Sequence, residues 1–393
     1  MREREFDIIV YGASGYTGRL VAEYLQSEYG GSDLKWAMAG RNASKLETVR
    51  AEMGISDTVD IVTANADAPD TLDALAKRTI AIITTVGPYQ LYGEPLVKAC
   101  ADNGTDYVDL CGEPAWMKDM ISRYDEAAKA SGARIVLSCG FDSIPFDLGV
   151  LHLQNHAIEN HGGAVSEVRC RVRSMKGTFS GGTAASFMET MKRAQRQPEI
   201  LDWLKDPFSL SPEAGPAQPA IHKPIEETDL GSWSTPFIMA SINTKNVHRS
   251  NALLDYRYGK DFKYGEMVLT GPGEQGEAIA RGMAKTNTFG DNPPKPGEGP
   301  TKEERETGSY DVMFVGDTAD GTRLISSVKG DRDPGYGSTS KMIAEAAMTL
   351  VKDVKGPNEG QQGGVTTPAP AMGEALIARL RDHAGLRFEI EKG

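Results

Sequence analysis

The chain has 393 residues, enough for two domains with buried cores. Its formal net charge of −12 argues against nucleic acid as a partner, because polyanions attract basic faces. Apolar runs such as "TIAIITTVG" are well under the roughly 20 residues that a membrane-spanning helix needs. The start, "MREREFDIIV", passes from charges directly into an apolar run, without the core of a signal peptide. We therefore expect a cytoplasmic protein with no transmembrane segment.

Residues 1–145 alternate short apolar runs with amphipathic stretches. This alternation predicts the α/β class, with a Rossmann-type doubly wound parallel sheet covered by helices on both faces. The expected strands lie at residues 6–11, 35–39, 60–63, 80–85, 106–110 and 134–138.

The alternation ends near residue 141, and residues 146–333 predict a second domain of α+β type. Its strand-like pieces, "SEVRCRVRSM" and "SYDVMFVGDT", alternate with a period of two. Tracts rich in proline and glycine at residues 206–224, 290–300 and 356–370 indicate long surface loops. The clearest helical pattern of this half is "STSKMIAEAAMTLVKDV", within the last segment, residues 334–393.

The glycine-rich stretch "GASGYTG" connects the first strand to an amphipathic helix. Such a turn suits a pyrophosphate, because glycines allow close backbone approach and the first helical N–H groups are unpaired. The three glycines are three residues apart, which differs from the G-x-G-x-x-G spacing. We expect Gly12 to make the turn, Gly15 to contact the pyrophosphate and Gly18 to let the helix pack on the sheet. The hydroxyls of Ser14 and Thr17 can donate to phosphate oxygens, and the expected cofactor-binding loop also includes Tyr16.

The second strand ends as "AGRNASKL", with no carboxylate at its tip. An acidic residue there would bind the ribose hydroxyls of NAD. Arg41 and Lys45 stand in its place, and a guanidinium can bind a 2′-phosphate through two charged hydrogen bonds. The sequence therefore predicts NADP(H) as the cofactor.

The loops after the later strands, "TVGPYQLYGEP", "DLCGEP" and "SCGFDSIPFD", should face the nicotinamide, because ligands bind beyond the carboxyl ends of parallel strands. Gly87 and Pro88 of the first loop are further candidates for cofactor contact. Candidates for proton handling and hydrogen-bond donation are Tyr89, Glu113, Asp142 and Ser143, and the alternative for each is a turn or helix cap. The histidines show no metal-binding spacing, and the four cysteines, which lack a C-x-x-C pair, are expected to be buried free thiols.

Several blocks together, among them "GASGYTGRL", "AGRNASKL", "YVDLCGEPAWM", "CGFDSIPFDLG" and "GDRDPGYGSTSKMIAEAAMTLV", resemble the saccharopine dehydrogenase-like oxidoreductases. The resemblance is to the branch that contains trans-acting enoyl reductases, and it covers nearly the whole chain. It implies an NADP-binding Rossmann domain at residues 1–145, an inserted substrate and catalytic domain at 146–333, and a segment at 334–393 whose helix packs back on the first domain.

The resemblance also implies an activity in lipid metabolism, the NADPH-dependent reduction of a carbon–carbon double bond in an acyl or polyketide-type lipid. A small-molecule, carrier-linked or coenzyme-A-linked substrate, a homodimer and a peripheral lipid contact are all compatible with it. Two alternatives stay open. One is a saccharopine- or opine-type dehydrogenase acting on a C–N bond, for which Arg169, Arg171 and Arg173 could bind substrate carboxylates; the other is an NADP(H)-binding sensor without turnover.

Overall fold

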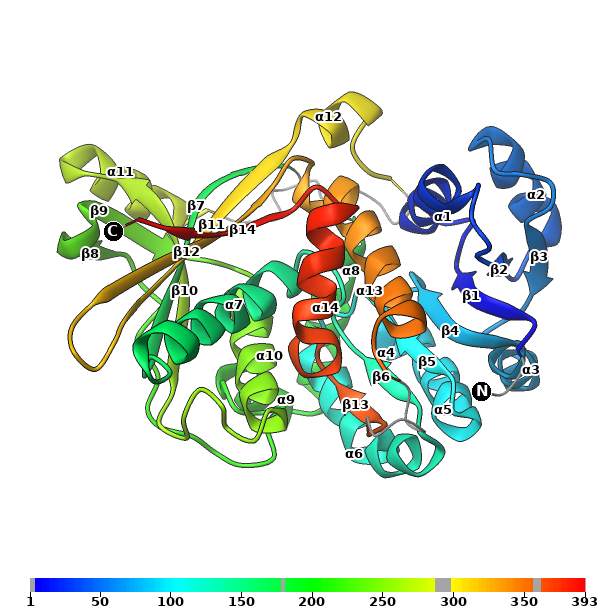
Figure 1. Ribbon diagram of the computed structural model, residues 1–393, viewed down its shortest axis with the longest axis horizontal. Helices are drawn as coiled ribbons and strands as arrows, with labels where there is room; N and C mark the ends of the chain where they lie inside the picture. The colour runs from blue at the N-terminus through cyan, green and yellow to red at the C-terminus, as the bar shows by residue number, and fades with distance from the viewer. Residues whose placement is uncertain (1–3, 178–180, 287–297, 356–361, 393) are drawn as a thin grey trace.

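The computed structural model describes residues 4–177, 181–286, 298–355 and 362–392. Within these ranges the chain forms two seven-stranded sheets. Figure 1 shows sheet A on the right and sheet C on the left, with helices α13 and α14 between them.

Sheet A is the parallel sheet that the first part of the sequence predicts. Its strand order is β13-β6-β5-β4-β1-β2-β3, and every neighbouring pair is parallel. The order reverses between β1 and β4, which is where doubly wound sheets bind their ligands. The strands are β1 (Phe6–Tyr11), β2 (Trp36–Gly40), β3 (Asp60–Thr63), β4 (Thr79–Thr84), β5 (Asp106–Val108), β6 (Arg134–Val136) and β13 (Gly364–Thr366). The helices between them are α1 (Tyr16–Tyr29), α2 (Ala43–Glu52), α3 (Pro69–Arg78), α4 (Tyr89–Tyr92), α5 (Glu94–Asn103) and α6 (Pro114–Ser131).

Sheet C is a mixed sheet in the order β14-β12-β11-β7-β10-β9-β8, in which only β7 and β10 pair in parallel among the described strands. Helices α7, α10 and α14 pack against it. The strands are β7 (Glu167–Lys176), β8 (Ile225–Glu227), β9 (Ser232–Pro236), β10 (Lys263–Gly271), β11 (Ser309–Asp317), β12 (Arg323–Gly330) and β14 (Arg387–Glu391). The remaining elements are α7 (Ile144–His161), α8 (Gly181–Arg196), α9 (Glu199–Lys205), the 3-10 turn η1 (Thr228–Leu230), α10 (Ala240–Leu253), α11 (Gly273–Met283), α12 (Lys302–Thr307), the π-helical turn η2 (Pro334–Ser338), α13 (Thr339–Lys352) and α14 (Pro368–Asp382).

The structure agrees with the predicted loops in only some of the proline- and glycine-rich tracts that it describes. Residues 206–224 contain no helix or strand, as expected of a loop. Most of the tract at 290–300 lies outside the described residues. The tract at 356–370 was wrongly interpreted as a loop throughout, because β13 extends sheet A beside β6 and α14 begins at Pro368. A strand of three residues is too short to show a period in the sequence.

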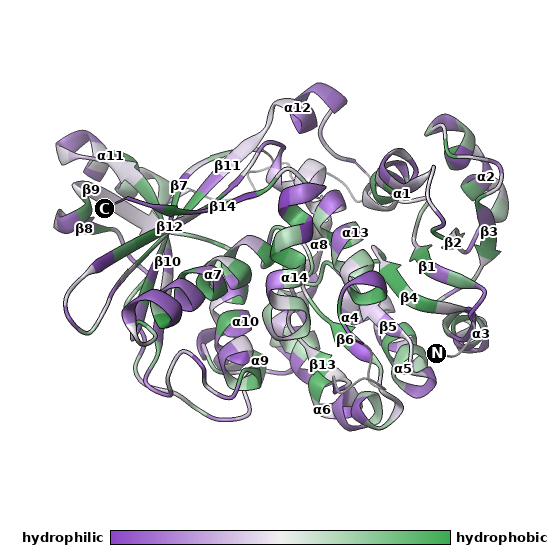
Figure 2. Cartoon of the chain, in the orientation of Figure 1, coloured by the Kyte–Doolittle hydropathy of each residue, from purple (hydrophilic) through white to green (hydrophobic). Residues whose placement is uncertain are grey.

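The last segment of the chain is divided between the two sheets. Its strand β13 belongs to sheet A, whereas β14 pairs with β12 in sheet C. Helix α13 packs against α1, α14 and strands of sheet A. In Figure 2 the strands of sheet A are largely hydrophobic, while the exposed helix α12 is hydrophilic.

A buried carboxylate fastens this segment to the first helix. Glu345 of α13 is fully buried and accepts hydrogen bonds from Tyr24 (2.6 Å) and Tyr29 (2.7 Å) of α1. Arg379 of α14 forms an ion pair with it at 3.3 Å. Burial raises the pKa of Glu345, and the two phenols and the guanidinium offset that cost. One side chain therefore holds α1, α13 and α14 together.

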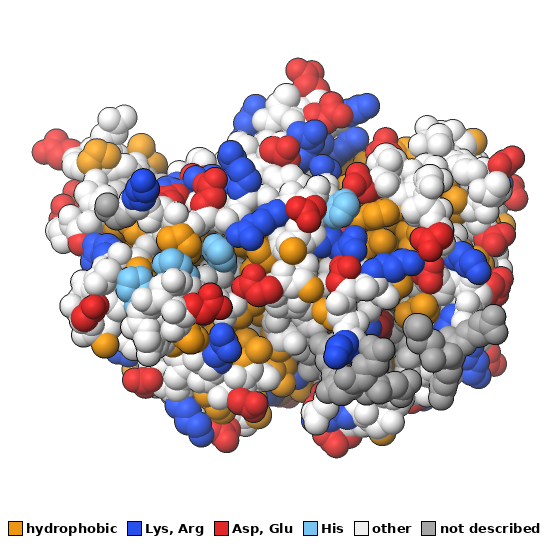
Figure 3. Space-filling view, viewed as in Figure 1, with side chains coloured by type: hydrophobic (Ala, Val, Ile, Leu, Met, Phe, Trp, Pro, Cys, Tyr) orange, Lys and Arg blue, Asp and Glu red, His pale blue; other side chains and the backbone are white. Residues whose placement is uncertain are grey.

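Acidic and basic side chains are interspersed over the face of the molecule in Figure 3, so that face presents no extended basic surface. Among the described helices, none combines the length and apolar character needed to cross a membrane.

Replacing Glu345 with Ala should lower the free energy of unfolding by about 3 kcal/mol, because the buried phenol of Tyr24, the partly buried phenol of Tyr29 and the guanidinium of Arg379 each lose one partner. Urea denaturation measures this loss. The matched control is Asp102→Ala, which removes the exposed ion pair with Lys98 and should cost less than about 0.5 kcal/mol. Equal losses in the two variants would contradict the role given to Glu345.

Candidate functional site

A cavity of about 760 Å³ lies along the carboxyl edge of sheet A. One wall consists of the loops that follow β1 to β6. The other wall comes from the second half of the chain, including α8, the start of α10 and η2. Its position at the switch in strand order is that of a dinucleotide site.

The glycine loop has the geometry expected for a phosphate contact. Gly12 has φ +90°, a conformation that side chains other than glycine rarely adopt. A Cβ on Gly18 would lie 2.2 Å from the carbonyl oxygen of Gly12, so the close packing of α1 on the sheet requires glycine. Gly15 is the exposed N-cap of α1, and no side chain caps the helix there. The first N–H groups of α1 therefore remain available to an anion.

Ser14 and Thr17 line the cavity beside this loop, but Tyr16 has a structural partner as well. The Tyr16 phenol donates to the carbonyl of Pro300 and accepts from Arg305 at 2.8 Å. Its ring packs edge-on against Tyr336 at 4.7 Å between centroids. Tyr16 thus connects the glycine loop to the second half of the chain.

The end of β2 presents two cations to the cavity. Arg41 and Lys45 are exposed and line it, and neither has a salt bridge within the described part of the chain. Asn42 lies between them and caps α2 by accepting from the N–H of Lys45 at 2.9 Å. Two unpaired cations beside a dinucleotide cleft suit a 2′-phosphate.

Glu113, a candidate for proton handling, is buried and fully engaged in hydrogen bonds. Its carboxylate accepts from the N–H groups of Tyr89 (2.8 Å) and Gln90 (2.9 Å), at the start of α4. It also accepts from the hydroxyl of Ser186 on α8 at 2.7 Å. Burial raises its pKa, and these donors act in the opposite direction. The side chain therefore joins α4 to α8.

Tyr89 lines the cavity, but its phenol is directed at the backbone of sheet A. It donates to the carbonyl of Thr84 at 3.2 Å and accepts from the N–H of Leu110 at 3.0 Å. Burial raises the pKa of the phenol strongly. Its hydroxyl thereby links the loops after β4 and β5. Gly87 lies beside it and also lines the cavity, whereas Pro88, joined to Gly87 by a cis peptide bond, does not.

Asp109, which sequence reasoning did not single out, organises the loops after β5 and β6. Its carboxylate accepts from Cys111 (3.0 Å), Ser138 (2.8 Å) and Tyr107 (2.9 Å). Ser138 has φ +64°, an uncommon conformation for a residue with a side chain, and its hydroxyl donates to Cys111 at 2.6 Å. The only signal in the sequence was an acidic residue at the end of an apolar strand.

Asp142 is different from the other carboxylates of this edge. It lines the cavity and is partly exposed to it, and its carboxylate has no hydrogen-bond partner among the described residues. Burial alone raises its pKa to about 6. A carboxyl group with this pKa gains and loses its proton nearer to neutral pH than an ordinary aspartate does, which suits a general acid.

Ser143 follows directly but lies behind the cavity wall. Its buried hydroxyl donates to the carbonyl of Asp142 at 2.8 Å and accepts from Asn246 of α10 at 2.6 Å. It does not line the cavity. Among the four expected candidates, Asp142 is therefore the one whose polar atoms are directed at the cavity and remain unpaired in the described structure.

The hydroxyls of the cavity wall are mostly engaged with protein groups. Donation to nearby carbonyl or carboxylate oxygens occupies Ser138, Ser186, Thr190, Ser241 and Thr339. Tyr92 of α4 is different, because it lines the cavity, is 43% exposed, and its phenol has no partner among the described residues. Sequence reasoning missed it, since Tyr89 and Tyr92 in "PYQLY" look equivalent there.

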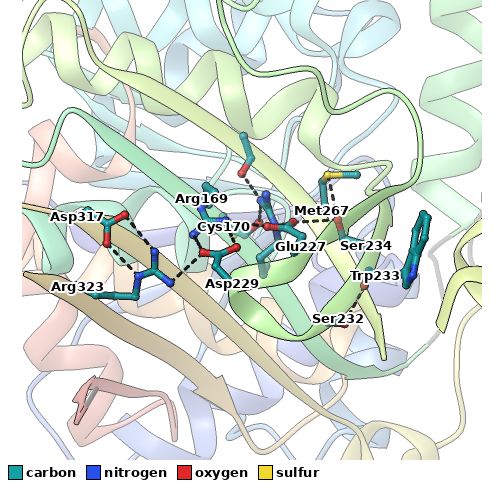
Figure 4. Close-up of polar contacts among 12 residues, drawn as sticks. Arg169, Cys170, Glu227, Asp229, Ser232, Trp233, Ser234, Met267, Asp317 and Arg323 are labelled. Atoms are coloured by element: carbon teal, nitrogen blue, oxygen red, sulfur yellow. Dashed lines mark hydrogen bonds and ion pairs between the residues drawn. The ribbon is translucent and has the colours of Figure 1, made fainter. Parts of the chain in front are cut away.

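The three arginines considered as a carboxylate clamp are already paired with acidic side chains. Arg169 binds Glu227 (3.0 Å) and Asp229, as Figure 4 shows. Arg171 binds the same Glu227. Arg173 binds Asp311 and Glu391. None of the three lines the cavity. The structure therefore gives no support to this part of the C–N dehydrogenase alternative.

The four cysteines are buried free thiols, as expected. Within the described ranges, His, Cys, Asp and Glu side chains form no cluster that could hold a metal ion.

Comparison with known proteins gives consistent results. Residues 8–136 match the family model described as the saccharopine dehydrogenase NADP binding domain. A Mycobacterium ulcerans protein named trans-acting enoyl reductase is 37% identical over 407 residues, covering 96% of both chains. A Mycobacterium tuberculosis relative that bears this name provisionally is 41% identical over 410 residues, again covering 96% of both.

Among solved structures, the apo histidine-tagged saccharopine dehydrogenase (L-Glu forming) from Saccharomyces cerevisiae is similar, with a TM-score of 0.49 and 13% identity. The match covers 98% of this chain and 100% of that chain. The family match at residues 8–136 identifies the cofactor as NADP(H). The glycine cradle and the two cations at the end of β2 fit such a dinucleotide.

Replacing Arg41 with Ala should weaken NADPH binding by roughly 10-fold to 100-fold, because charged hydrogen bonds to the 2′-phosphate are lost. NADH binding should change little. Calorimetric titration of both nucleotides checks this, with Arg257→Ala, an exposed arginine outside the cavity lining, as the control. Equal losses for the two nucleotides would refute the assignment.

Proposed function

The chain belongs to the saccharopine dehydrogenase-like oxidoreductases, in the branch of trans-acting enoyl reductases, and from this membership we propose that it is an NADPH-dependent enoyl reductase. Its substrate is the α,β-unsaturated acyl group of a lipid or polyketide-type intermediate, bound as a carrier- or coenzyme-A-linked thioester. The proposal also includes the expected cytoplasmic location and a homodimer, which cell fractionation and gel filtration test.

The observation that carries the proposal is the unpaired carboxyl group of Asp142 at the cavity wall. NADPH supplies a hydride when bound, and reduction of a conjugated alkene then requires one proton at the α-carbon. Burial disfavours the charged form of Asp142 and raises its pKa to about 6, so a larger fraction of the enzyme carries this proton near neutral pH than with an ordinary aspartate. The other carboxylates of this edge, Asp109 and Glu113, are occupied by protein donors.

Negative charge that develops on the substrate carbonyl oxygen needs a hydrogen-bond donor. We assign this role to Tyr92. Outside the glycine loop, its phenol is the hydroxyl group of the described cavity lining that has no hydrogen-bond partner. Tyr89, Glu113 and Ser143 act as positioning residues: Tyr89 links two loops, Glu113 joins α4 to α8, and Ser143 connects the Asp142 loop to α10.

Replacing Asp142 with Asn should lower kcat by about 100-fold with an enoyl thioester, because general acid catalysis is lost. In the wild type the acid must be protonated, so kcat/KM should fall as the pH rises above about 6. The variant should lack this dependence. NADPH oxidation followed by absorbance measures both effects. A variant with wild-type turnover and the same pH profile would exclude Asp142 as the donor.

Replacing Tyr92 with Phe should reduce kcat by roughly 10-fold to 100-fold, since one donor to the developing oxyanion is removed. The ring is retained, so KM should change much less than kcat. Tyr256→Phe, which alters a phenol outside the cavity lining, is the control. If Tyr92→Phe behaved like this control, the assignment would be wrong.

Turnover with lysine plus 2-oxoglutarate, and none with enoyl thioesters, would instead favour a C–N bond dehydrogenase. Tight NADPH binding without turnover on either substrate class would favour a sensor.

A further inference from the structure

Large apolar side chains are exposed on α4, on α8 and at the end of β7. Exposed fractions reach 53% for Leu91, 50% for Phe187 and 54% for Met188. We call this surface the apolar strip, which consists of Leu91, Tyr92, Met175, Phe187, Met188 and Met191. Single exposed apolar residues are ordinary, but a group on adjoining elements indicates a binding surface.

Hydrogen bonds hold the two helices of the strip against each other. Gln90 of α4 donates to the carbonyl of Ser186 (3.3 Å) and to the hydroxyl of Thr190 (3.1 Å) on α8. Thr190 and Ala194 are buried on the inner face of α8. Phe187 and Met191 border this inner face at helical spacing, and Met188 lies further towards solvent on the same side. The strip is therefore attached to the first domain at the cavity edge.

The strip is continuous with the cavity, because Tyr92, Met175 and Phe187 belong to both. A volume of about 760 Å³ is within the roughly 300–1,000 Å³ range of a site for one drug-sized ligand. This cavity has to accommodate a dinucleotide together with the reacting carbons. A longer acyl chain would therefore have to leave the cavity, and the apolar strip lies where it emerges.

We propose that the apolar strip binds the distal acyl chain of the substrate, so that the enzyme selects long-chain over short-chain enoyl groups. This inference rests on the proposed reductase function. Methionine supplies three members of the strip, and its unbranched, polarisable side chain adapts to flexible apolar ligands. Nearby cations are paired internally, Lys192 with Glu189 and Arg193 with Asp119. An uncharged chain fits this surface better than an acidic protein or an anionic membrane.

The test compares coenzyme A thioesters of trans-2-enoyl chains, from crotonyl to hexadecenoyl. In the wild type, kcat/KM should rise about three- to fourfold for each methylene that reaches the strip. The double variant Met188→Gln/Met191→Gln should reduce this slope, because both replacements keep the side-chain length but remove apolar surface. Met283→Gln changes a methionine of α11 that is 47% exposed and outside the cavity lining, and it should retain the slope.

A flat dependence on chain length, or an unchanged slope in the double variant, would overturn the proposal while leaving the reductase function intact. Calorimetric binding of saturated acyl coenzyme A thioesters in the presence of NADP+ gives a readout without turnover. Affinity that rises with chain length and loses this rise in the double variant supports the strip, even if no reduction occurs. Binding to phosphatidylcholine vesicles that the double variant abolishes, combined with a flat chain-length dependence, would identify a membrane surface as the occupant instead.

Discussion

The arrangement of the site depends on the carboxylate of Glu113. It satisfies two N–H groups at the start of α4 and one hydroxyl of α8, so that a single buried group joins these two helices at the cavity edge. Tyr92 and the members of the apolar strip on α4 and α8 owe their positions to these helices. Removing such a group leaves three donors unsatisfied, which costs more than the net value of the hydrogen bonds themselves. The interaction therefore holds α4 and α8 in place at this edge of the cavity.

The carboxyl groups of Asp109, Glu113 and Asp142 lie near the same edge of sheet A but differ in their hydrogen-bond partners. Asp109 receives three donors that hold two loops in place, although burial still raises its pKa to about 7. The carboxylate of Glu113 also accepts hydrogen bonds from three donors. Asp142 receives none among the described residues, and only its burial sets its pKa. A carboxyl group that stabilises structure has its oxygens occupied, whereas a group that exchanges a proton with a ligand must keep one accessible.

Much of this molecule could be predicted from its sequence. The alternating pattern of residues 1–145 indicated sheet A, because each strand and helix there has its own period, and the tip of β2 indicated NADP(H). The strand β13 could not be predicted, since three residues beside glycines carry no period. The different surroundings of Tyr89 and Tyr92 depend on contacts with Thr84 and Leu110 that no spacing reveals. The partners of the three β7 arginines come from strands and turns distant in the sequence, for the same reason.

The division of residues 362–392 between the two sheets bears on how the protein is made. Strand β13 completes sheet A beside β6, and β14 is the edge of sheet C, yet both are translated after nearly all of their neighbours. Neither sheet can reach its final form on the ribosome until this segment emerges. Sheet A thus keeps β6 as an open edge during most of translation, and an open strand edge can pair with other chains.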